Sequence, residues 1–257
     1  MKFEKWQALG NDYLIVTEPV DPETVRALCH RHLGVGADGV LHFERTDEPG
    51  YVARLRIFNP DGSEAELSGN GAREALMWIH HHGWAPGPEF SITTIAGEIR
   101  AHVLDDRSCR VDMGRAKIKE PGTIGEFAYQ ALEVGNPQCA IRIGDRDTLD
   151  ALDLPAIGPA IEHDERWPNR TNVSFWTELA PDRIRARIFE RGVGETMSSG
   201  TGATGAAVAH VLRGGDSPVT VELDGGELIV DVGEDYHIDL TGWAVPVFTG
   251  EWPANAR

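Results

Sequence analysis

Short apolar runs separated by turn residues dominate the pattern of hydrophobic and polar positions along the chain. In the first half these runs cover 13–16, 52–58, 90–94 and 99–104, and in the second half 138–143, 172–176, 183–189, 219–223 and 228–232. Runs of this length predict strands. The segments before Asn172 and around Gly158-Pro159 are interpreted as connecting loops because glycine and proline punctuate them.

Three segments have a helical pattern instead. Pro22–His32 is a predicted helix with Asp21 as its N-cap and proline at its first position. Gly71–His81 and Gly202–Leu212 each follow a Ser-Gly-x-Gly-Ala turn, and the second is small and apolar nearly all round, which indicates an enclosed helix. The fold class predicted is α+β, with a mostly antiparallel sheet or barrel around a central helix in each of two pseudo-symmetric domains.

The two halves repeat the same landmarks in the same order. Ile57-Phe58 is followed eleven residues later by the Ser68-Gly69-Asn70-Gly71-Ala72 turn, and Ile188-Phe189 stands at the same spacing from Ser199-Gly200-Thr201-Gly202-Ala203. The remaining landmarks are Glu64 and Glu195, Leu9-Gly10-Asn11 and Val134-Gly135-Asn136, and Ala96-Gly97-Glu98-Ile99 and Gly225-Gly226-Glu227-Leu228. Such agreement predicts a duplicated domain. We place the first domain at 1–117, with 244–257 returning to it, and the second at 118–243, joined near 115–124.

Composition narrows the class of protein. The hydrophobic fraction of 41% and charged fraction of 25% are typical of globular proteins, and no apolar run reaches the ~20 residues of a membrane helix. A net charge of −17 argues against nucleic acid and anionic membranes as partners. The first residues lack a signal-peptide pattern, and the three cysteines fit neither a disulfide framework nor a zinc site. A cytoplasmic location is expected.

The paired turns carry the candidate chemistry. A glycine-rich turn that leads into a helix presents unpaired N–H groups and the positive end of the helix dipole, which suit a carboxylate. A single turn of this kind more often only caps a helix. Two of them facing each other, each with a polar side chain, would suit proton removal on one face of a carbon and proton return on the other.

The sequence resembles the diaminopimelate epimerase family over essentially its whole length. The resemblance rests on Leu9-Gly10-Asn11-Asp12-Tyr13, the 34–39 segment, Ile57–Glu64, both serine turns, Gly135-Asn136-Pro137, Asn172-Val173 and Glu190–Thr196. It implies a cofactor-independent amino-acid epimerase, a small amino-acid substrate and a homodimer. It also implies that the substrate's carboxylate and amino groups are bound by Asn11, Asn59, Asn70, Asn136, Asn172, Glu190 and Arg191, and by the backbone of Gly69-Asn70 and Gly200-Thr201.

These residue types suit a zwitterion. Arg191 can bind a carboxylate bidentately, Glu190 can accept from an ammonium group, and asparagines donate and accept without adding charge. The alternatives are that Asn11 and Asn136 only form turns after glycine, and that Arg191 forms a surface ion pair.

The departures from the family pattern fall on the proton-transfer groups. The family has a cysteine at the start of each turn, where this chain has Ser68 and Ser199, and often a histidine where this chain has Gln138. A cysteine thiol ionises near 8.5 and lower at a helix N-terminus, whereas a neutral serine hydroxyl is a poor base without a partner. The resemblance still places Ser68 and Ser199 at the two catalytic positions.

Three interpretations remain open. The chain is an epimerase of LL- and meso-2,6-diaminopimelate that uses serine, or it is an engineered Cys→Ser form that binds without efficient catalysis. Alternatively it is an isomerase or dehydratase of another small carboxylic acid, with Glu64, Glu66 or Glu195 as base.

Two further motifs are interpreted as unrelated to cofactors or metals. Gly34-x-Gly36-x-x-Gly39 matches the dinucleotide fingerprint but follows a helix instead of joining a strand to one. His80-His81-His82 lies at a predicted helix end, where consecutive side chains point in different directions. We therefore expect no cofactor and no metal.

Overall fold

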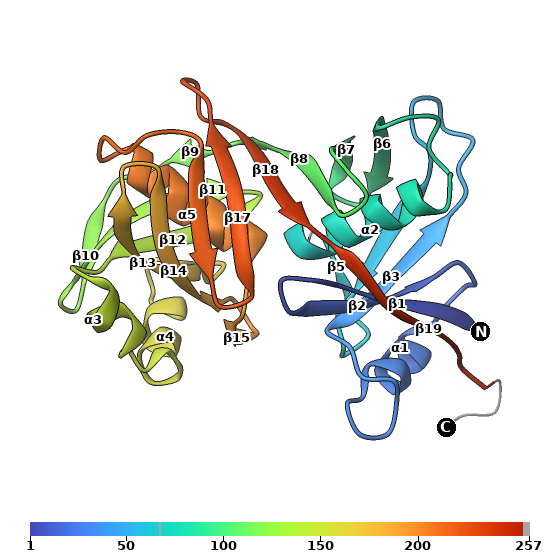
Figure 1. Ribbon diagram of the computed structural model, residues 1–257. Coiled ribbons are helices and arrows are strands. Elements are labelled where there is room, and N and C mark those ends of the chain that lie inside the picture. Colours follow the sequence, from blue (N-terminus) through green and yellow to red (C-terminus); the bar gives the residue numbers. More distant parts are fainter. Residues whose placement is uncertain (67, 254–257) are drawn as a thin grey trace. The chain divides into compact units, whose positions relative to one another are not determined.

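The computed structural model describes residues 1–66 and 68–253, which form two compact units. The first unit comprises Met1–Val111 and the C-terminal segment from Gly242, and the second comprises Asp112–Thr241. Figure 1 shows each unit as strands wrapped around one long helix.

The first unit contains most of the strands of the N-terminal half and the last strand of the chain. These are β1 (Lys2–Ala8), β2 (Asn11–Val16), β3 (Gly39–Glu44), β4 (Arg54–Phe58), β5 (Glu64–Ala65), β6 (Glu89–Thr94), β7 (Gly97–Val103), the start of β8 (Ser108–Arg115) and β19 (Val245–Glu251). Its helices are α1 (Pro22–Cys29) and α2 (Gly69–His81). The strands pair in the order β19-β1-β2-β3-β4-β6-β7-β8, with β5 also on β4.

The second unit contains the remaining elements. Its strands are β9 (Lys117–Ile118), β10 (Gly122–Ile124), β11 (Phe127–Val134), β12 (Asn136–Arg142), β13 (Asn172–Ala180), β14 (Arg183–Glu190), β15 (Gly194–Thr196), β16 (Val219–Leu223), β17 (Gly226–Val232) and most of β18 (His237–Trp243). Its helices are α3 (Arg146–Asp150), α4 (Leu154–Glu162) and α5 (Gly200–Val211). The main strands pair in the order β11-β12-β13-β14-β16-β17-β18, with β15 also on β14.

The repeat seen in the sequence is a repeat of topology and register. β2 and β3 are parallel in the first unit, as are β12 and β13 in the second. The pairs β4 with β6 and β14 with β16 are also parallel, while the other pairs along the two orders are antiparallel. Glu64 pairs with Phe58 in the first unit, and Glu195 pairs with Phe189 in the second. The predicted α+β class, with a sheet around a helix twice over, is therefore confirmed.

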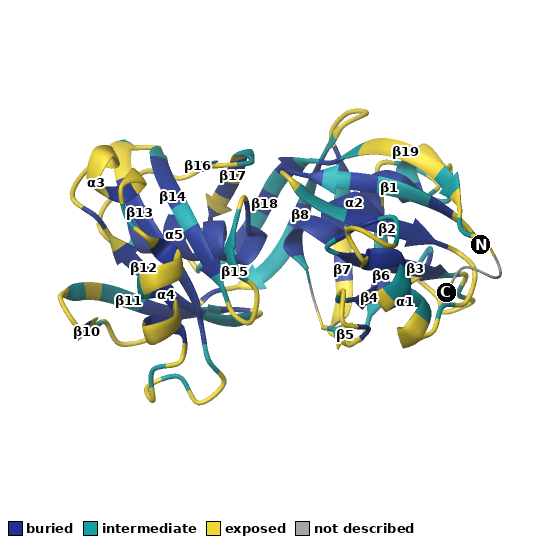
Figure 2. Ribbon diagram, turned by 90° about the horizontal axis from the view of Figure 1, so that it is seen from below, coloured by how far each residue is buried: buried dark blue, intermediate teal, exposed yellow. Residues whose placement is uncertain are grey.

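The two central helices form the middle of each unit. Residues 69–79 of α2 and 200–210 of α5 are all buried, and both helices are dark blue over most of their length in Figure 2. A helix buried on every side is typically apolar or rich in small residues, and α5 fits this apart from His210, whereas α2 also buries Arg73 and Glu74. Helices α2 and α5 begin at Gly69 and Gly200, two residues earlier than the apolar pattern indicated, because the first glycine of each turn already has helical geometry.

Several predictions of local structure were wrong. The first helix ends at Cys29 instead of His32, since His30 is extended. Gly158-Pro159 is not a loop but lies inside α4, where Pro159 lacks only one backbone donor. A Cβ at Gly158 would lie 2.5 Å from the Phe189 ring, so the glycine lets the helix pack closely instead of marking a turn.

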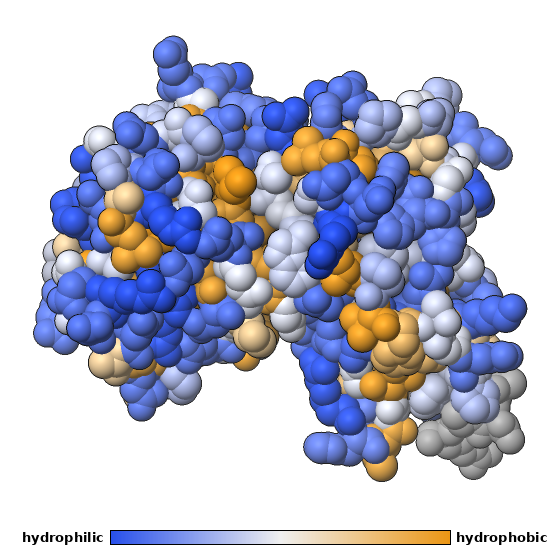
Figure 3. All heavy atoms as spheres, in the orientation of Figure 1, coloured by the Kyte–Doolittle hydropathy of each residue, from blue (hydrophilic) through white to orange (hydrophobic). Residues whose placement is uncertain are grey.

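The outer surface is mostly polar, as Figure 3 shows for one face. Large apolar side chains that are exposed include Leu33, Ile95, Val193 and Phe248. Among the residues that the structure describes, none of the helices is long and apolar enough to cross a membrane.

Candidate active site

Three neighbouring strands of the second unit bring predicted site residues to one edge. Asn136 begins β12, Asn172 begins the parallel strand β13, and Glu190 ends the antiparallel strand β14. The registers Gln138↔Asn172 and Val173↔Phe189 place these three ends side by side. The sequence folds this way because tight turns at Gly135 and Gly192, both with positive φ, reverse the chain there.

Ser199 lies at the same edge and joins α5 to β14. Its Oγ accepts a hydrogen bond from the backbone N–H of Gly202 at 3.2 Å, so it is the N-cap of α5. The same hydroxyl donates to Oε2 of Glu190 at 2.8 Å, while Thr196 Oγ1 donates to Oε1 at 2.7 Å. The carboxylate of Glu190 therefore holds two hydroxyl groups, and one of them belongs to the predicted catalytic position.

Asn172 orders the loop that follows Glu190. Its buried Oδ1 accepts the backbone N–H of Arg191 at 2.8 Å. The Arg191 guanidinium is exposed and donates to the Asn169 carbonyl at 3.0 Å, and it makes no ion pair within the described part of the chain. Among the described residues, Arg191 therefore does not form the surface ion pair that is the alternative interpretation of this side chain.

Gln138 stands where the family often has histidine. Its Nε2 donates to Oδ1 of Asn136 at 2.5 Å, and its Oε1 is buried without a hydrogen-bond partner among the described residues. A Cβ at Gly205 would lie 3.2 Å from the Gln138 side chain, so α5 needs a glycine there to accommodate it. Gln138 orients the Asn136 amide but supplies no titratable group.

The first unit repeats this edge with different partners. Asn11 begins β2 and Asn59 follows β4, at the end where Asp38 precedes β3. Asn11 Nδ2 donates to Oδ2 of Asp38 at 2.8 Å, and Asn59 Nδ2 donates to Oγ of Ser63 at 3.0 Å.

A charged cluster supports the Asn11 turn. Asp12 pairs with Lys5 at 2.5 Å and with Arg31 at 3.0 Å, and Arg31 also pairs with Asp38. Burial opposes ionisation of Asp12, but the hydrogen bonds from Arg31 and Lys5 outweigh it and lower the pKa of Asp12. Asp12 is therefore ionised near neutral pH, and its ion pairs hold the turn in place.

Ser68 occupies the same local position as Ser199. It is half-buried and extended, and its Oγ accepts the N–H of Gly71 at 3.1 Å, which makes it the N-cap of α2. Asn70 lies buried one residue inside the helix, and its Oδ1 accepts from Arg73 at 2.6 Å. Both predicted catalytic serines are therefore helix caps with N–H groups of the first turn beside them.

Glu64 and Glu195, considered as alternative bases, are ion-paired. Arg56 donates twice to Glu64, at 3.0 and 2.8 Å, and Arg187 donates twice to Glu195, at 3.0 and 2.6 Å. The hydrogen bond from Arg56 lowers the pKa of Glu64, which makes it a weaker base. The duplicated pair has a structural role, because it ties β4 to β5 and β14 to β15. Glu66 is exposed.

The remaining motifs have local structural explanations. Gly34 and Gly36 donate their backbone N–H groups to His30 and Leu28 carbonyls at the end of α1, so the glycine fingerprint terminates a helix as expected. His81 Nε2 donates to the Asp106 carbonyl, and His82 pairs with Glu4. Cys29, Cys109 and Cys139 are buried and free. Within the described residues no group of three metal-binding side chains exists.

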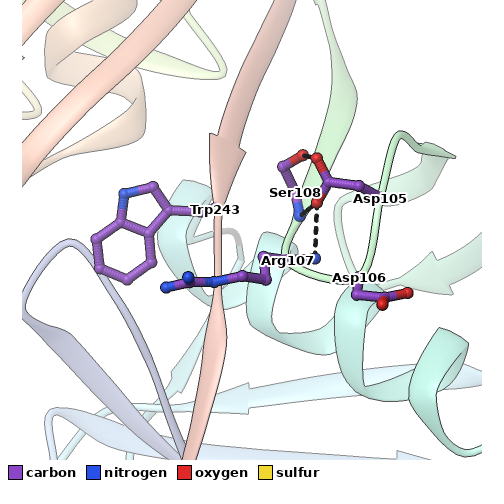
Figure 4. Close-up of a pocket in the computed structure, with 5 residues that line it drawn as sticks. All are labelled: Asp105, Asp106, Arg107, Ser108 and Trp243. Carbon is purple, nitrogen blue, oxygen red and sulfur yellow. Dashed lines mark hydrogen bonds between the residues drawn. The ribbon is translucent and has the colours of Figure 1, made fainter.

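A hollow of about 580 Å³ lies in the first unit, lined by Asp105, Asp106, Arg107, Ser108 and Trp243. Figure 4 shows Asp105 accepting hydrogen bonds within its own turn between β7 and β8. The turn adjoins His81 at the C-terminal end of α2, whereas Ser68 caps its N-terminal end. The hollow is thus separate from the serine turn.

Sequence reasoning missed three supporting residues. Thr196 donates a hydrogen bond to Glu190, and Arg73 donates one to Asn70. The buried carboxylate of Glu162 accepts the N–H of Gly192 at 2.9 Å and also pairs with Arg170. The first two could have been found from their fixed spacing to the duplicated turns. Glu162 carries no such signal.

Known proteins resemble this chain in sequence and in fold. The sequence model described as diaminopimelate epimerase matches residues 3–119 and 130–247. The diaminopimelate epimerase of Synechococcus sp. (strain JA-3-3Ab) is 39% identical to this chain, and the match covers 97% of each of the two sequences. The diaminopimelate epimerase of Picosynechococcus sp. (strain ATCC 27264 / PCC 7002 / PR-6) is 40% identical, and the match covers 98% of each. A phenazine biosynthesis protein of the PhzF family from Bacillus anthracis has the same fold, with a TM-score of 0.78, 17% identity and coverage of 98% and 99%. The chain therefore belongs to the diaminopimelate epimerase family.

Proposed function

We propose that this protein interconverts LL- and meso-2,6-diaminopimelate by two proton transfers, without a cofactor, in lysine biosynthesis. The observation that carries the proposal is the bond from Ser199 to Glu190, because it couples a hydroxyl at a helix start to a carboxylate that can accept its proton. The family membership supports the substrate, since the relatives named above are diaminopimelate epimerases.

The proposed substrate-binding groups lie at the strand edges and helix starts described above for each unit. The backbone N–H groups of Gly69-Asn70 and Gly200-Thr201 lie in the first turns of α2 and α5, where a carboxylate gains from unpaired donors and the helix dipole. Glu190 and Arg191 would bind an amino group and a carboxylate. The asparagines would supply directional hydrogen bonds, and they are Asn11, Asn59, Asn70, Asn136 and Asn172.

Ser68 and Ser199 are proposed as the acid/base residues, one for each proton transfer. As Ser199 Oγ takes the α-proton, its own proton passes to Oε2 of Glu190, so no free alkoxide is formed. The Cα–H bond and the original Ser199 O–H bond break, a new O–H bond forms at the serine and another at the Glu190 carboxylate, and the electron pair stays on the substrate carbon. Ser68 Oγ then gives its proton to the opposite face of that carbon and takes one from water, while Glu190 returns its proton to water. This relay supplies the base that a lone hydroxyl lacks.

The cellular setting is also proposed. The composition supports a cytoplasmic protein acting on a small molecule, and the family resemblance supports a homodimer. We propose the same two domains as above, 1–117 with 244–257 and 118–243. The alternative of an isomerase or dehydratase using Glu64 or Glu195 is less favoured, because both carboxylates are bound by arginines.

Deuterium incorporation tests the proposal. The protein is incubated with LL-diaminopimelate in D₂O, and the α-carbon label and the meso product are followed by NMR and chiral chromatography. Labelling with formation of meso product is expected. Binding by calorimetry with no label would overturn catalysis and leave a binder, and absence of both would overturn the substrate. A matched Ser199→Ala variant controls for exchange that does not involve the turn.

A further inference from the structure

Arg73 is a fully buried cation in the first turns of α2. Its Nη1 donates to the Gly69 carbonyl at 3.0 Å, its Nη2 donates to Oδ1 of Asn70 at 2.6 Å, and its Nε has no partner among the described residues. Both acceptors are neutral, and the described part of the chain shows no ion pair at this guanidinium. The side chain reaches back toward the helix start, as helical side chains do.

The neighbouring acid does not neutralise this cation. Glu74 is also fully buried, and burial raises the pKa of Glu74 well above its usual range, with Arg73 offsetting only part of the effect. Burial lowers the pKa of Arg73 to about 10, which still leaves it protonated at neutral pH. The start of α2 therefore carries a buried positive charge beside a carboxyl group whose ionisation is opposed by burial.

Such a charge costs stability. A cation near a helix N-terminus opposes the helix dipole, and a buried charge without an acidic partner is expensive. Residues that violate these rules are expected mainly at functional sites.

The hydrogen bond to Asn70 fixes which way its amide faces. A guanidinium can only donate, so the atom beside Nη2 must be the carbonyl oxygen of the amide. The Nδ2 group is then turned away from Arg73. Arg73 therefore fixes the orientation of the Asn70 side chain at the turn.

The second unit shows which part of this arrangement is common to both turns. Thr204 stands at the same spacing from Ser199 as Arg73 does from Ser68, and its Oγ1 donates to the Gly200 carbonyl at 2.8 Å. Both turns thus have a side chain holding the carbonyl of the first glycine. Only the first turn adds a positive charge and an oriented amide.

We propose that Arg73 is a positioning residue for the Ser68 turn, which orients the Asn70 amide and makes the turn electrostatically favourable for anions. The proposal rests on the proposed function in that the anion is the substrate carboxylate. The same charge also favours the ionised form of any acid placed at position 68.

A thiol reporter tests the charge without substrate. In the Ser68→Cys variant the thiol pKa is measured from the pH dependence of its alkylation by iodoacetamide, with the unchanged protein as the blank because its own cysteines are buried. Adding Arg73→Met is expected to raise that pKa by roughly one unit, whereas Arg73→Lys keeps most of the effect. An unchanged thiol pKa in folded Ser68→Cys/Arg73→Met protein would overturn the electrostatic role.

Matched variants separate charge from packing. Thr204→Val in a Ser199→Cys background removes the equivalent carbonyl bond without a charge, so the thiol there is expected to keep its pKa. Circular dichroism confirms folding, and Arg73→Gln replaces Arg73→Met if the latter does not fold. A shift of equal size with Thr204→Val would show that the bond alone is responsible and overturn the proposal.

Steady-state kinetics test the orientation of the Asn70 amide. Arg73→Lys keeps the charge but loses the two-pronged donor, so KM for diaminopimelate is expected to rise several-fold with a smaller change in kcat. Asn70→Ala should abolish this difference between arginine and lysine. If the reporter behaves as expected but no epimerase activity exists, the proposed function fails while the anion-favouring turn stands.

Discussion

Ser199 Oγ lies 2.8 Å from Oε2 of Glu190, and the hydroxyl donates its proton to the carboxylate. The same hydroxyl accepts from the N–H of Gly202, so its lone pairs and its proton are both directed by the fold. A hydroxyl held this way can accept a proton from a substrate on its oxygen while its own proton moves to the carboxylate.

Glu190→Gln should slow α-proton exchange by about 10²–10⁴-fold, since loss of a general acid–base group typically has this size. The amide keeps a similar shape but cannot take up the proton. Exchange is measured by NMR in D₂O with diaminopimelate. Glu195→Gln is the control, because its carboxylate binds Arg187 and should be dispensable for exchange. Full exchange in Glu190→Gln would refute the relay.

Replacing both serines by cysteine, Ser68→Cys/Ser199→Cys, should raise kcat at pH 8 by more than about tenfold. A thiol ionises near pH 8.5, and each unit of pKa favouring the ionised form is worth about tenfold. The single variants should gain less, because one hydroxyl remains. Steady-state rates of meso formation measure this, and a slower double variant would show that these positions do not transfer protons.

Asn172→Ala should raise KM by about fivefold, because about 1 kcal/mol of hydrogen bonding to the Arg191 N–H is lost and the loop is released. Asn172→Asp keeps an oxygen acceptor and should restore the loop. KM from initial rates distinguishes the two. Equal effects of both substitutions would mean that the side chain acts through its own amide N–H group.

The repeated fold was readable from the sequence because spacing constrains topology. The equal interval from Ile57 and Ile188 to the two turns required the same strand, hairpin and helix in each half, and the registers of Glu64 and Glu195 agree. Helix α4 itself was not readable from the sequence, because Gly158 and Pro159 are turn signals locally and only packing on Phe189 explains the glycine.

Residues that stand in a motif of the family could be predicted as site residues from the sequence. Residues that only support another side chain could be predicted less well. Asn11 and Ser199 stand in recognisable motifs. The bond from Arg73 to Asn70 depends on how a buried side chain reaches back along the helix, and polarity along the sequence indicates instead an exposed arginine. Strand β1 escaped notice because its charged residues alternate with apolar ones only partly.

Arg187→Met should destabilise the protein by about 2–4 kcal/mol, whereas the equivalent Arg56→Met should cost less than about 1 kcal/mol. The Arg187 side chain is 13% exposed and also donates to carbonyls of Leu149 and Leu152, while Arg56 is 38% exposed. Urea unfolding of the two variants measures the difference. Equal costs would show that burial does not strengthen the pair in the second unit.

Glu74→Gln should raise Tm at pH 7 by a few degrees, since about 1 kcal/mol moves Tm by about 2–4 °C in a chain of this size. Burial raises the pKa of Glu74, so the folded protein keeps a proton that the unfolded chain loses near pH 4.3. The free energy of unfolding therefore falls as pH rises above that value. The advantage of Glu74→Gln should shrink toward pH 4, and scanning calorimetry at both pH values tests this.

Strand β19 pairs with β1 from Lys2↔Glu251 to Gln7↔Val245, although β1 is synthesised long before β19. On a ribosome adding about 5–20 residues per second, the outer edge of β1 waits on the order of 10–50 s for its partner. An open strand edge attracts other chains, and charged side chains discourage such pairing. Lys2, Glu4 and Lys5 on this strand would therefore protect the nascent chain from such pairing until β19 is synthesised.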